Sequence, residues 1–268
     1  MITIDWKERL KQDTADYLEH KLPQQNYDFE IIFNWYPERV QGHIPSEVIL
    51  FVAREMAAKL SRNHEQYIAF YQYLWDKKGD YGKIVFMQFM TRFLPKKPLV
   101  YLPIIEKIML KANVHDISAI FEKVFLPLVK KQADAYIMHF YKWMESGTEA
   151  LRKQTTAFLI KVVKRNPELT SAVLKHLQNR WGYPLAEAIQ THVALLKALW
   201  KTDAKAVKDI YQEYHITRDP QTVEILCGAI TDYSSELEQI VENWTHSGNA
   251  RLKKAATSAY KLLQKKKA

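Results

Sequence analysis

Apolar residues recur every three to four positions along almost the whole chain, which is the pattern of amphipathic helices. Between residues 148 and 165, for example, Leu151, Phe158 and Val162 share one helical face, and charged residues occupy much of the rest. Prolines stand at or near the starts and breaks of the periodic segments: Pro23, Pro45, Pro98, Pro167, Pro184 and Pro220. The pattern predicts an all-helical protein.

The predicted helices follow one another in pairs. An N-terminal pair covers residues 5–22 and 28–40, and a helix over 45–62 follows it. The further pairs are 64–77 with 80–94, 98–111 with 115–131, 133–145 with 148–165, 168–180 with 184–201, 203–214 with 219–233, and 234–245 with 249–264. Because no glycine- or serine-rich linker interrupts the chain, we expect one domain over residues 1–268. It has an N-terminal helical pair in about residues 1–42 and six further pairs.

A tryptophan followed four positions later by a glycine recurs in the chain as Trp75 with Gly79, Trp143 with Gly147, and Trp244 with Gly248. The tryptophans are 68 and 101 positions apart, and both spacings are close to multiples of about 34, a period typical of helical repeats. The glycine allows the left-handed conformation that ends a helix, and the tryptophan is expected to pack on its own helix and the next repeat. We therefore predict a HEAT-like, armadillo-type solenoid, an α-α superhelix of stacked helix pairs.

Composition limits the class of protein further. The single cysteine, Cys227, excludes an intramolecular disulfide and a cysteine-based zinc site, and it favours a reducing compartment. The N-terminus lacks the basic and apolar regions of a signal peptide, and no uncharged apolar stretch reaches 18 residues. These features predict a soluble cytoplasmic protein that does not enter a membrane.

The chain carries a formal net charge of +9 and has a pI near 9.3. Such an excess favours a polyanionic partner, of which nucleic acid is the first candidate and an anionic membrane surface the second. The alternative is an ordinary solvated surface rich in lysine. The charge alone does not decide between these interpretations.

Basic residues recur on the second helices of the predicted pairs, which line the concave side of a superhelix. A row of such cations matches the requirements of a phosphate backbone, although each is also compatible with a plain solvated face. The candidate nucleic-acid-binding residues are Lys83, Arg92, Arg152, Lys153, Lys161, Lys164, Arg165, Arg251, Lys253 and Lys254.

Motifs for cofactor or metal chemistry are absent from the sequence. It contains neither a glycine-rich nucleotide loop nor an HExxH motif, and no two histidines stand three or four positions apart on one helix. We therefore expect no cofactor and no metal. One polar pair, His115 with Asp116, follows Asn113 at a predicted helix start. It is interpreted either as part of a helix-capping cluster or as a site that lines a groove on the concave side.

Several segments are similar to motifs of one family, the bacterial HEAT-like DNA alkylation repair glycosylases of the AlkD type. Residues 74–76 (Leu-Trp-Asp) resemble the family's Glu-Leu-Trp-Asp segment. Residues 142–146 (Lys-Trp-Met-Glu-Ser) with 151–153 (Leu-Arg-Lys) are similar to its Lys-Trp-x-x-Ser and Leu-x-Arg segment. Residues 42–45 resemble its Gly-x-x-x-Pro turn with one residue fewer. The resemblance covers about residues 27–200.

The resemblance implies a basic concave groove that holds duplex DNA, and an Asp, four positions after a Trp, that promotes loss of the alkylated base. In this chain Val114 stands in place of that Trp and Ser118 in place of that Asp, and the family's second groove Trp falls near Leu195. A shift of two residues would put Asp116 in the catalytic place, still without the Trp. Lys153 matches an arginine that contacts the DNA backbone.

Three functions follow as hypotheses. We favour a protein that binds duplex DNA and is related to alkylation repair but lacks standard glycosylase activity. The second is an active alkylpurine DNA glycosylase that uses Asp116 as its catalytic residue. The third is a scaffold that binds a protein partner on its concave face. In each case we expect a monomer.

Overall fold

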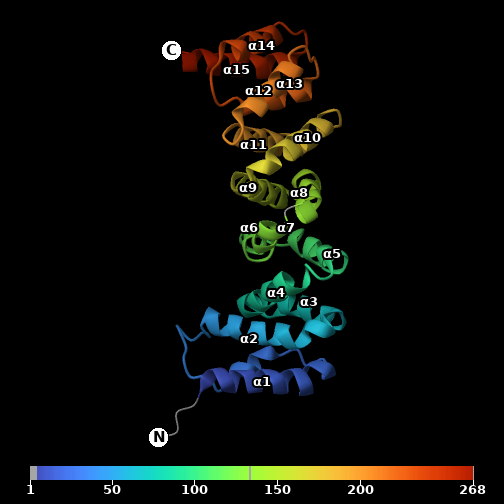
Figure 1. The fold of residues 1–268 in the computed structure, drawn as a ribbon, viewed down its shortest axis with the longest axis vertical. Coiled ribbons are helices and arrows are strands. Elements are labelled where there is room, and N and C mark those ends of the chain that lie inside the picture. The colour runs from blue at the N-terminus through green and yellow to red at the C-terminus, as the bar shows by residue number, and fades with distance from the viewer. Residues whose placement is uncertain (1–4, 133, 268) are drawn as a thin grey trace. The chain divides into compact units, whose positions relative to one another are not determined.

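The computed structural model describes residues 5–132 and 134–267, and it is all-helical (Figure 1). Extended backbone in these residues is limited to one isolated bridge between Val40 and His43. The chain divides into two compact units, of which the first ends at Gln132 and the second starts at Ala133. The prediction of an all-α protein is confirmed.

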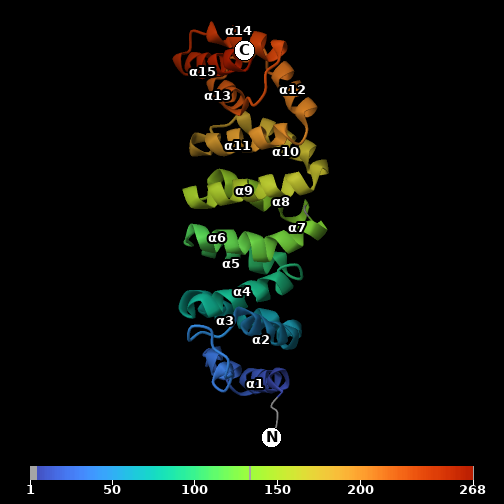
Figure 2. The same cartoon turned by 90° about the vertical axis from the view of Figure 1, so that its left-hand side faces the viewer.

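The first unit contains, in chain order, α1 (Trp6–His20), α2 (Ser46–Lys59), α3 (Ile68–Lys77), α4 (Gly79–Phe93), α5 (Pro98–Met109), α6 (Val114–Ile120) and α7 (Leu126–Gln132). A π-helical turn, Phe121–Phe125, joins α6 to α7. The helix α1 packs against α2, α2 packs against α4, and α3 pairs with α4 (Figure 2). The π-helical turn packs on the other side of α4, so α4 lies at the centre of this unit.

The second unit contains, in chain order, α8 (Asp134–Ser146), α9 (Glu149–Arg165), α10 (Thr170–Trp181), α11 (Ile189–Trp200), α12 (Ala204–Glu213), α13 (Pro220–Ala229), α14 (Ser235–Thr245) and α15 (Ala250–Lys267). Contacts run from α9 to α11, from α11 to α13, and from α13 to α15, so these helices form one layer. Each of the other helices contacts a helix of this layer: α8 contacts α9, α10 and α12 contact α11, and α14 contacts α15. We call α9, α11, α13 and α15 the second-helix layer.

Short polar side chains fix where many of these helices begin. Each accepts a hydrogen bond from a free backbone N–H of the first turn, which stabilises the helix start by about 1 kcal/mol. The capping residues are Asp5, Asn113, Thr148, Asp203, Asp219 and Ser234. Such caps explain why the periodic segments of the sequence give helix boundaries within a few residues of those observed.

The helix predicted over residues 28–40 is wrong. Only a short 3₁₀ helix, Phe29–Phe33, forms there. Pro37 lacks a backbone N–H and clashes with a continuing helix, so it excludes the second half of the prediction. The chain instead makes a tight turn with positive φ at Gln41 (52°) and Gly42 (83°), closed by the bridge beside it.

The glycines of the Trp-Gly repeat do not share one conformation. Gly79 is left-handed, with φ of 54°, as predicted. Gly147 and Gly248 are not in the left-handed region, so the predicted reason for these two is wrong. At Gly147 the cause is space, because a Cβ atom there would lie 2.6 Å from the carbonyl oxygen of Trp143.

Candidate functional site

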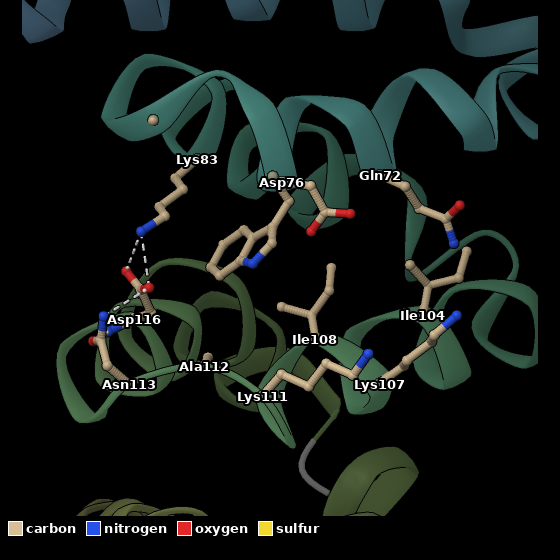
Figure 3. A pocket seen from close by; sticks show the side chains of 12 residues that line it. Gln72, Asp76, Lys83, Ile104, Lys107, Ile108, Lys111, Ala112, Asn113 and Asp116 are labelled. Atoms are coloured by element: carbon tan, nitrogen blue, oxygen red, sulfur yellow. Dashed lines mark hydrogen bonds and ion pairs between the residues drawn. The ribbon is translucent and has the colours of Figure 1, made fainter.

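A cavity of about 570 Å³ opens in the first unit between the α3–α4 pair and α5 with the start of α6 (Figure 3). Its position depends on close packing at the α3–α4 corner. A Cβ atom on Gly82 of α4 would lie 2.0 Å from the backbone carbonyl oxygen of Leu74 in α3. Only glycine permits this approach, and it places Trp75 at the end of α3 beside Lys83 at the start of α4.

Asp116, the predicted catalytic residue, lies in the first turn of α6 at one end of the cavity. Its two carboxylate oxygens accept hydrogen bonds from Lys83 Nζ at 3.0 and 2.8 Å, and Asn113 Nδ2 donates to one of them at 3.1 Å. The backbone N–H of Asp116 donates to Asn113 Oδ1 at 2.9 Å, which is the predicted capping arrangement. The structure thus brings Asp116 together with one predicted cation, Lys83, in an ion pair that neutralises both.

Trp75 is the residue of this site that sequence reasoning misplaced. Trp143 and Trp244 are buried in the core as expected, whereas Trp75 is only partly buried and lines the cavity. Its ring makes an edge contact with Phe86, with centroids 5.2 Å apart, and the Lys83 ammonium lies 5.5 Å from its centroid. These contacts hold an aromatic surface at the cavity wall.

Two adjoining hollows mark the exposed face of the second-helix layer. One, of about 680 Å³, lies between α9 and α11 and includes Arg152 and Lys153. The other, of about 610 Å³, lies between α11, α13 and α15 and includes Arg251 and Lys254. Gln190 of α11 lines both hollows, so they are parts of one continuous surface.

Three predicted cations of this surface are already paired with carboxylates. Arg152 contacts Glu187 and also donates to the carbonyl oxygen of Gly147 at 2.7 Å. Lys153 pairs with Glu149 within α9. Arg251 pairs with Glu224 of α13, with 2.6 Å between Nη2 and Oε2.

The remaining predicted cations, other than Lys161, are exposed and form no ion pair in the part of the chain that the structure describes. They are Arg92, Lys164, Arg165, Lys253 and Lys254. Lys161 is partly buried and has interactions of its own.

Sequence reasoning missed Lys197, which lines the hollow beside Lys254. Lys197 stands seven positions after Gln190 and therefore on the same face of α11. Sequence reasoning also missed Lys107 and Lys111, which line the cavity of the first unit.

The positions that the family resemblance singles out have different surroundings. Val114 is 47% exposed and Ser118 is partly buried. Leu195 is fully buried in the core, so it does not reach the surface where a groove residue must lie. In that register the chain offers no exposed side chain in place of the second groove Trp.

A second polar cluster of the second unit is centred on Glu145 of α8, which approaches residues of α10 and α11. Its carboxylate contacts His176 Nε2 at 2.9 Å and Arg180 Nε at 2.8 Å, and His192 Nε2 lies 3.7 Å away. Burial alone would raise the pKa of Glu145, but the hydrogen bond to His176, the nearby His192 and the charge of Arg180 hold that pKa far below its usual range. His192 is fully buried, its Nδ1 accepts from Trp181 Nε1 at 3.3 Å, and desolvation lowers its pKa.

Within the described residues no group of three or more His, Cys, Asp or Glu side chains is arranged to hold a metal ion. No helix among them is long and apolar enough to cross a lipid bilayer. The chain matches no family model, no curated protein and no solved structure. The resemblance to the alkylation repair family therefore stays a prediction.

Proposed function

We propose that the chain is a HEAT-like repeat protein that binds the phosphate backbone of duplex DNA on its second-helix layer, without base-excision chemistry. The repeat architecture is supported by the sequence separation of its side-chain contacts. Lys83 contacts Asp116 33 positions away, and Arg152 contacts Glu187 35 positions away. Separations of 31 to 37 recur at His64, Lys96, His176, Gln178 and Arg180. This recurrence supports our proposal that successive helix pairs stack with corresponding positions side by side, as in a solenoid.

The single observation that carries the DNA-binding proposal is the continuous basic face of this layer. Its two hollows are lined by the cations Arg152, Lys153, Lys197, Arg251 and Lys254 and by the carboxylates Glu149, Glu187 and Glu224. The balance is positive, and α15 as a whole carries seven Lys or Arg residues and no Asp or Glu. Such a face suits a polyanion with regularly spaced charges.

The proposal does not extend to catalysis by Asp116. A carboxylate that promotes loss of a base has to face the sugar on which positive charge develops. Here both oxygens of Asp116 are held by Lys83, and Asn113 donates to one of them. The carboxylate is thus engaged within the protein, which supports a role in shaping the cavity.

Fluorescence anisotropy of a labelled duplex, measured at low salt, tests the proposal. The variant Lys197→Glu with Lys254→Glu reverses two cations of the proposed face, and the matched control Lys205→Glu with Lys208→Glu reverses two exposed cations of α12 in the other layer. We expect the first variant to weaken binding by about tenfold or more and the control by less than about threefold, because only the first removes phosphate contacts.

Two results would refute the proposal. One is the absence of binding even at low salt, where phosphate contacts are strongest. The other is an equal effect of the two variants, which would show that net charge and not this face governs binding. If a specific protein is captured instead and nucleic acid does not displace it, the scaffold hypothesis replaces ours.

A further inference from the structure

The cavity of the first unit has chemistry that backbone binding on the second-helix layer does not use. Gln72 and Asp76 of α3 lie along one side, and Lys107 of α5 and Lys111, which follows this helix, lie along the other, facing them across the open space (Figure 3). No ion pair joins Asp76 to either lysine in the described residues. Opposite charges thus face each other without contact, with space for a ligand between them.

The wall between these polar sides is apolar. Trp75, Ile104 and Ile108 line it, and the edge contact of Phe86 fixes the orientation of the indole. A flat ring is the group that gains most from such a wall, because it stacks on or packs against an aromatic surface over its whole area.

The ion pair between Lys83 and Asp116 closes one end of the cavity and leaves no net charge there. The charges that remain for a ligand are the two ammonium groups of Lys107 and Lys111 and the carboxylate of Asp76, all exposed. A ligand that satisfies all three carries an anionic group at one end and N–H donors at the other. A carboxylate accepts from the amino groups of nucleobases, as in protein contacts to cytosine N4.

We infer that this cavity binds a single nucleotide. The base lies against Trp75 with its donor edge toward Asp76 and Gln72, and the phosphate contacts Lys107 and Lys111. The cavity volume of about 570 Å³ falls in the range of about 300–1,000 Å³ that is usual for small-molecule sites. The nucleotide is either free or an unpaired residue of a nucleic acid strand, and only the strand form rests on the proposed DNA-binding function.

Isothermal titration calorimetry with nucleoside monophosphates tests whether the cavity binds a free nucleotide. We expect GMP, AMP and CMP to bind about tenfold more tightly than their nucleosides, since the phosphate adds charge-assisted hydrogen bonds. Lys107→Ala with Lys111→Ala removes this difference. The control, Lys59→Ala with Lys123→Ala, removes two exposed lysines of the same unit that do not line the cavity, and it leaves the difference unchanged.

Asp76→Asn tests the orientation of the base. It weakens binding of GMP by about fivefold or more and weakens binding of UMP less, because UMP offers its N3–H but no exocyclic amino group. Because Asp76, Lys107 and Lys111 are exposed, these substitutions leave the core intact.

An oligonucleotide duplex with one unpaired 2-aminopurine tests whether the cavity binds an unpaired nucleotide of a strand. We expect its fluorescence to change on binding, and the change to be lost in Trp75→Leu but kept in the Lys59 and Lys123 control. A response in either arm identifies the source of the nucleotide, whereas no response in both arms overturns the inference. If duplex DNA still binds in that case, the proposed function stands without the nucleotide site. If duplex binding fails while monophosphates bind, the nucleotide site stands alone.

Discussion

Gly82→Ala is the substitution with the sharpest expected effect on both fold and site. The new Cβ would lie 2.0 Å from the carbonyl oxygen of Leu74 and 2.5 Å from Lys78 Cβ. A carbon atom normally approaches a carbonyl oxygen to about 3.3 Å, so α3 and α4 would have to separate by about 1 Å. Leu74 is fully buried and its oxygen belongs to the backbone, so no side-chain rotation relieves the contact.

Overpacking of this kind costs about 3 kcal/mol or more. The better helix propensity of alanine returns only about 1 kcal/mol of that. Gly228→Ala is the matched control, since its Cβ would meet the methyl groups of Val193 at 3.0 and 3.1 Å, and Val193 is a partly exposed side chain that has room to shift. We expect the control to change the free energy of unfolding by no more than about 1 kcal/mol.

Urea unfolding followed by far-UV circular dichroism measures both variants. The free energy of unfolding should fall at least about 1 kcal/mol further in Gly82→Ala than in Gly228→Ala. Nucleotide binding should also weaken in Gly82→Ala, since Trp75 and Lys83 flank the altered corner. Equal stability of the two variants would refute the claim that backbone contact at Gly82 sets the geometry of the α3–α4 pair.

Two further predictions concern buried polar groups. Glu145→Gln should lower the free energy of unfolding by about 2 kcal/mol at pH 7, because it removes the ion pair to Arg180 and the carboxylate that contacts His176. Since the folded-state pKa of Glu145 is lowered, its stabilisation is complete above about pH 4.3 and declines as the pH falls further. Thermal unfolding at pH 3 and pH 7 tests this. An equal loss of stability in Glu145→Gln at the two pH values would contradict the prediction. His64 is buried against Tyr101, and burial lowers its pKa. The free energy of unfolding of the wild type should therefore fall as the pH drops below about 6.5. Between pH 7 and pH 5 this fall should be about 1 kcal/mol smaller in His64→Phe. Identical pH profiles of the wild type and His64→Phe would disprove this.

The helices were predictable from sequence because each depends on local information. Apolar periodicity identifies the buried face of each helix, and residues such as Thr148 and Ser234 cap its start. The segment 28–40 has helical periodicity in its first half, but Pro37 ends the helix within it. The error came from giving the apolar pattern more weight than one backbone constraint.

The ion pairs were not predicted, although the repeat period contained the information. Lys83 with Asp116 and Arg152 with Glu187 are opposite charges 33 and 35 positions apart, close to the period of about 34 that the tryptophan spacing predicts. The cavity was not predictable in this way. It depends on the contact between Gly82 and Leu74, which leaves no periodic signal in the sequence.

The same pairs change what the net charge of +9 means for DNA binding. A cation such as Arg152 has to leave its carboxylate before it contacts a phosphate, and Glu187 then repels that phosphate. Only unpaired cations such as Lys197 and Lys254 release counterions without this cost. Since the logarithm of the binding constant falls with the logarithm of salt concentration by about 0.9 per phosphate contact, the slope should count the unpaired cations alone. Glu187→Gln frees Arg152, so it should steepen the slope by about 1, and an unchanged slope would mean that Arg152 lies outside the DNA path.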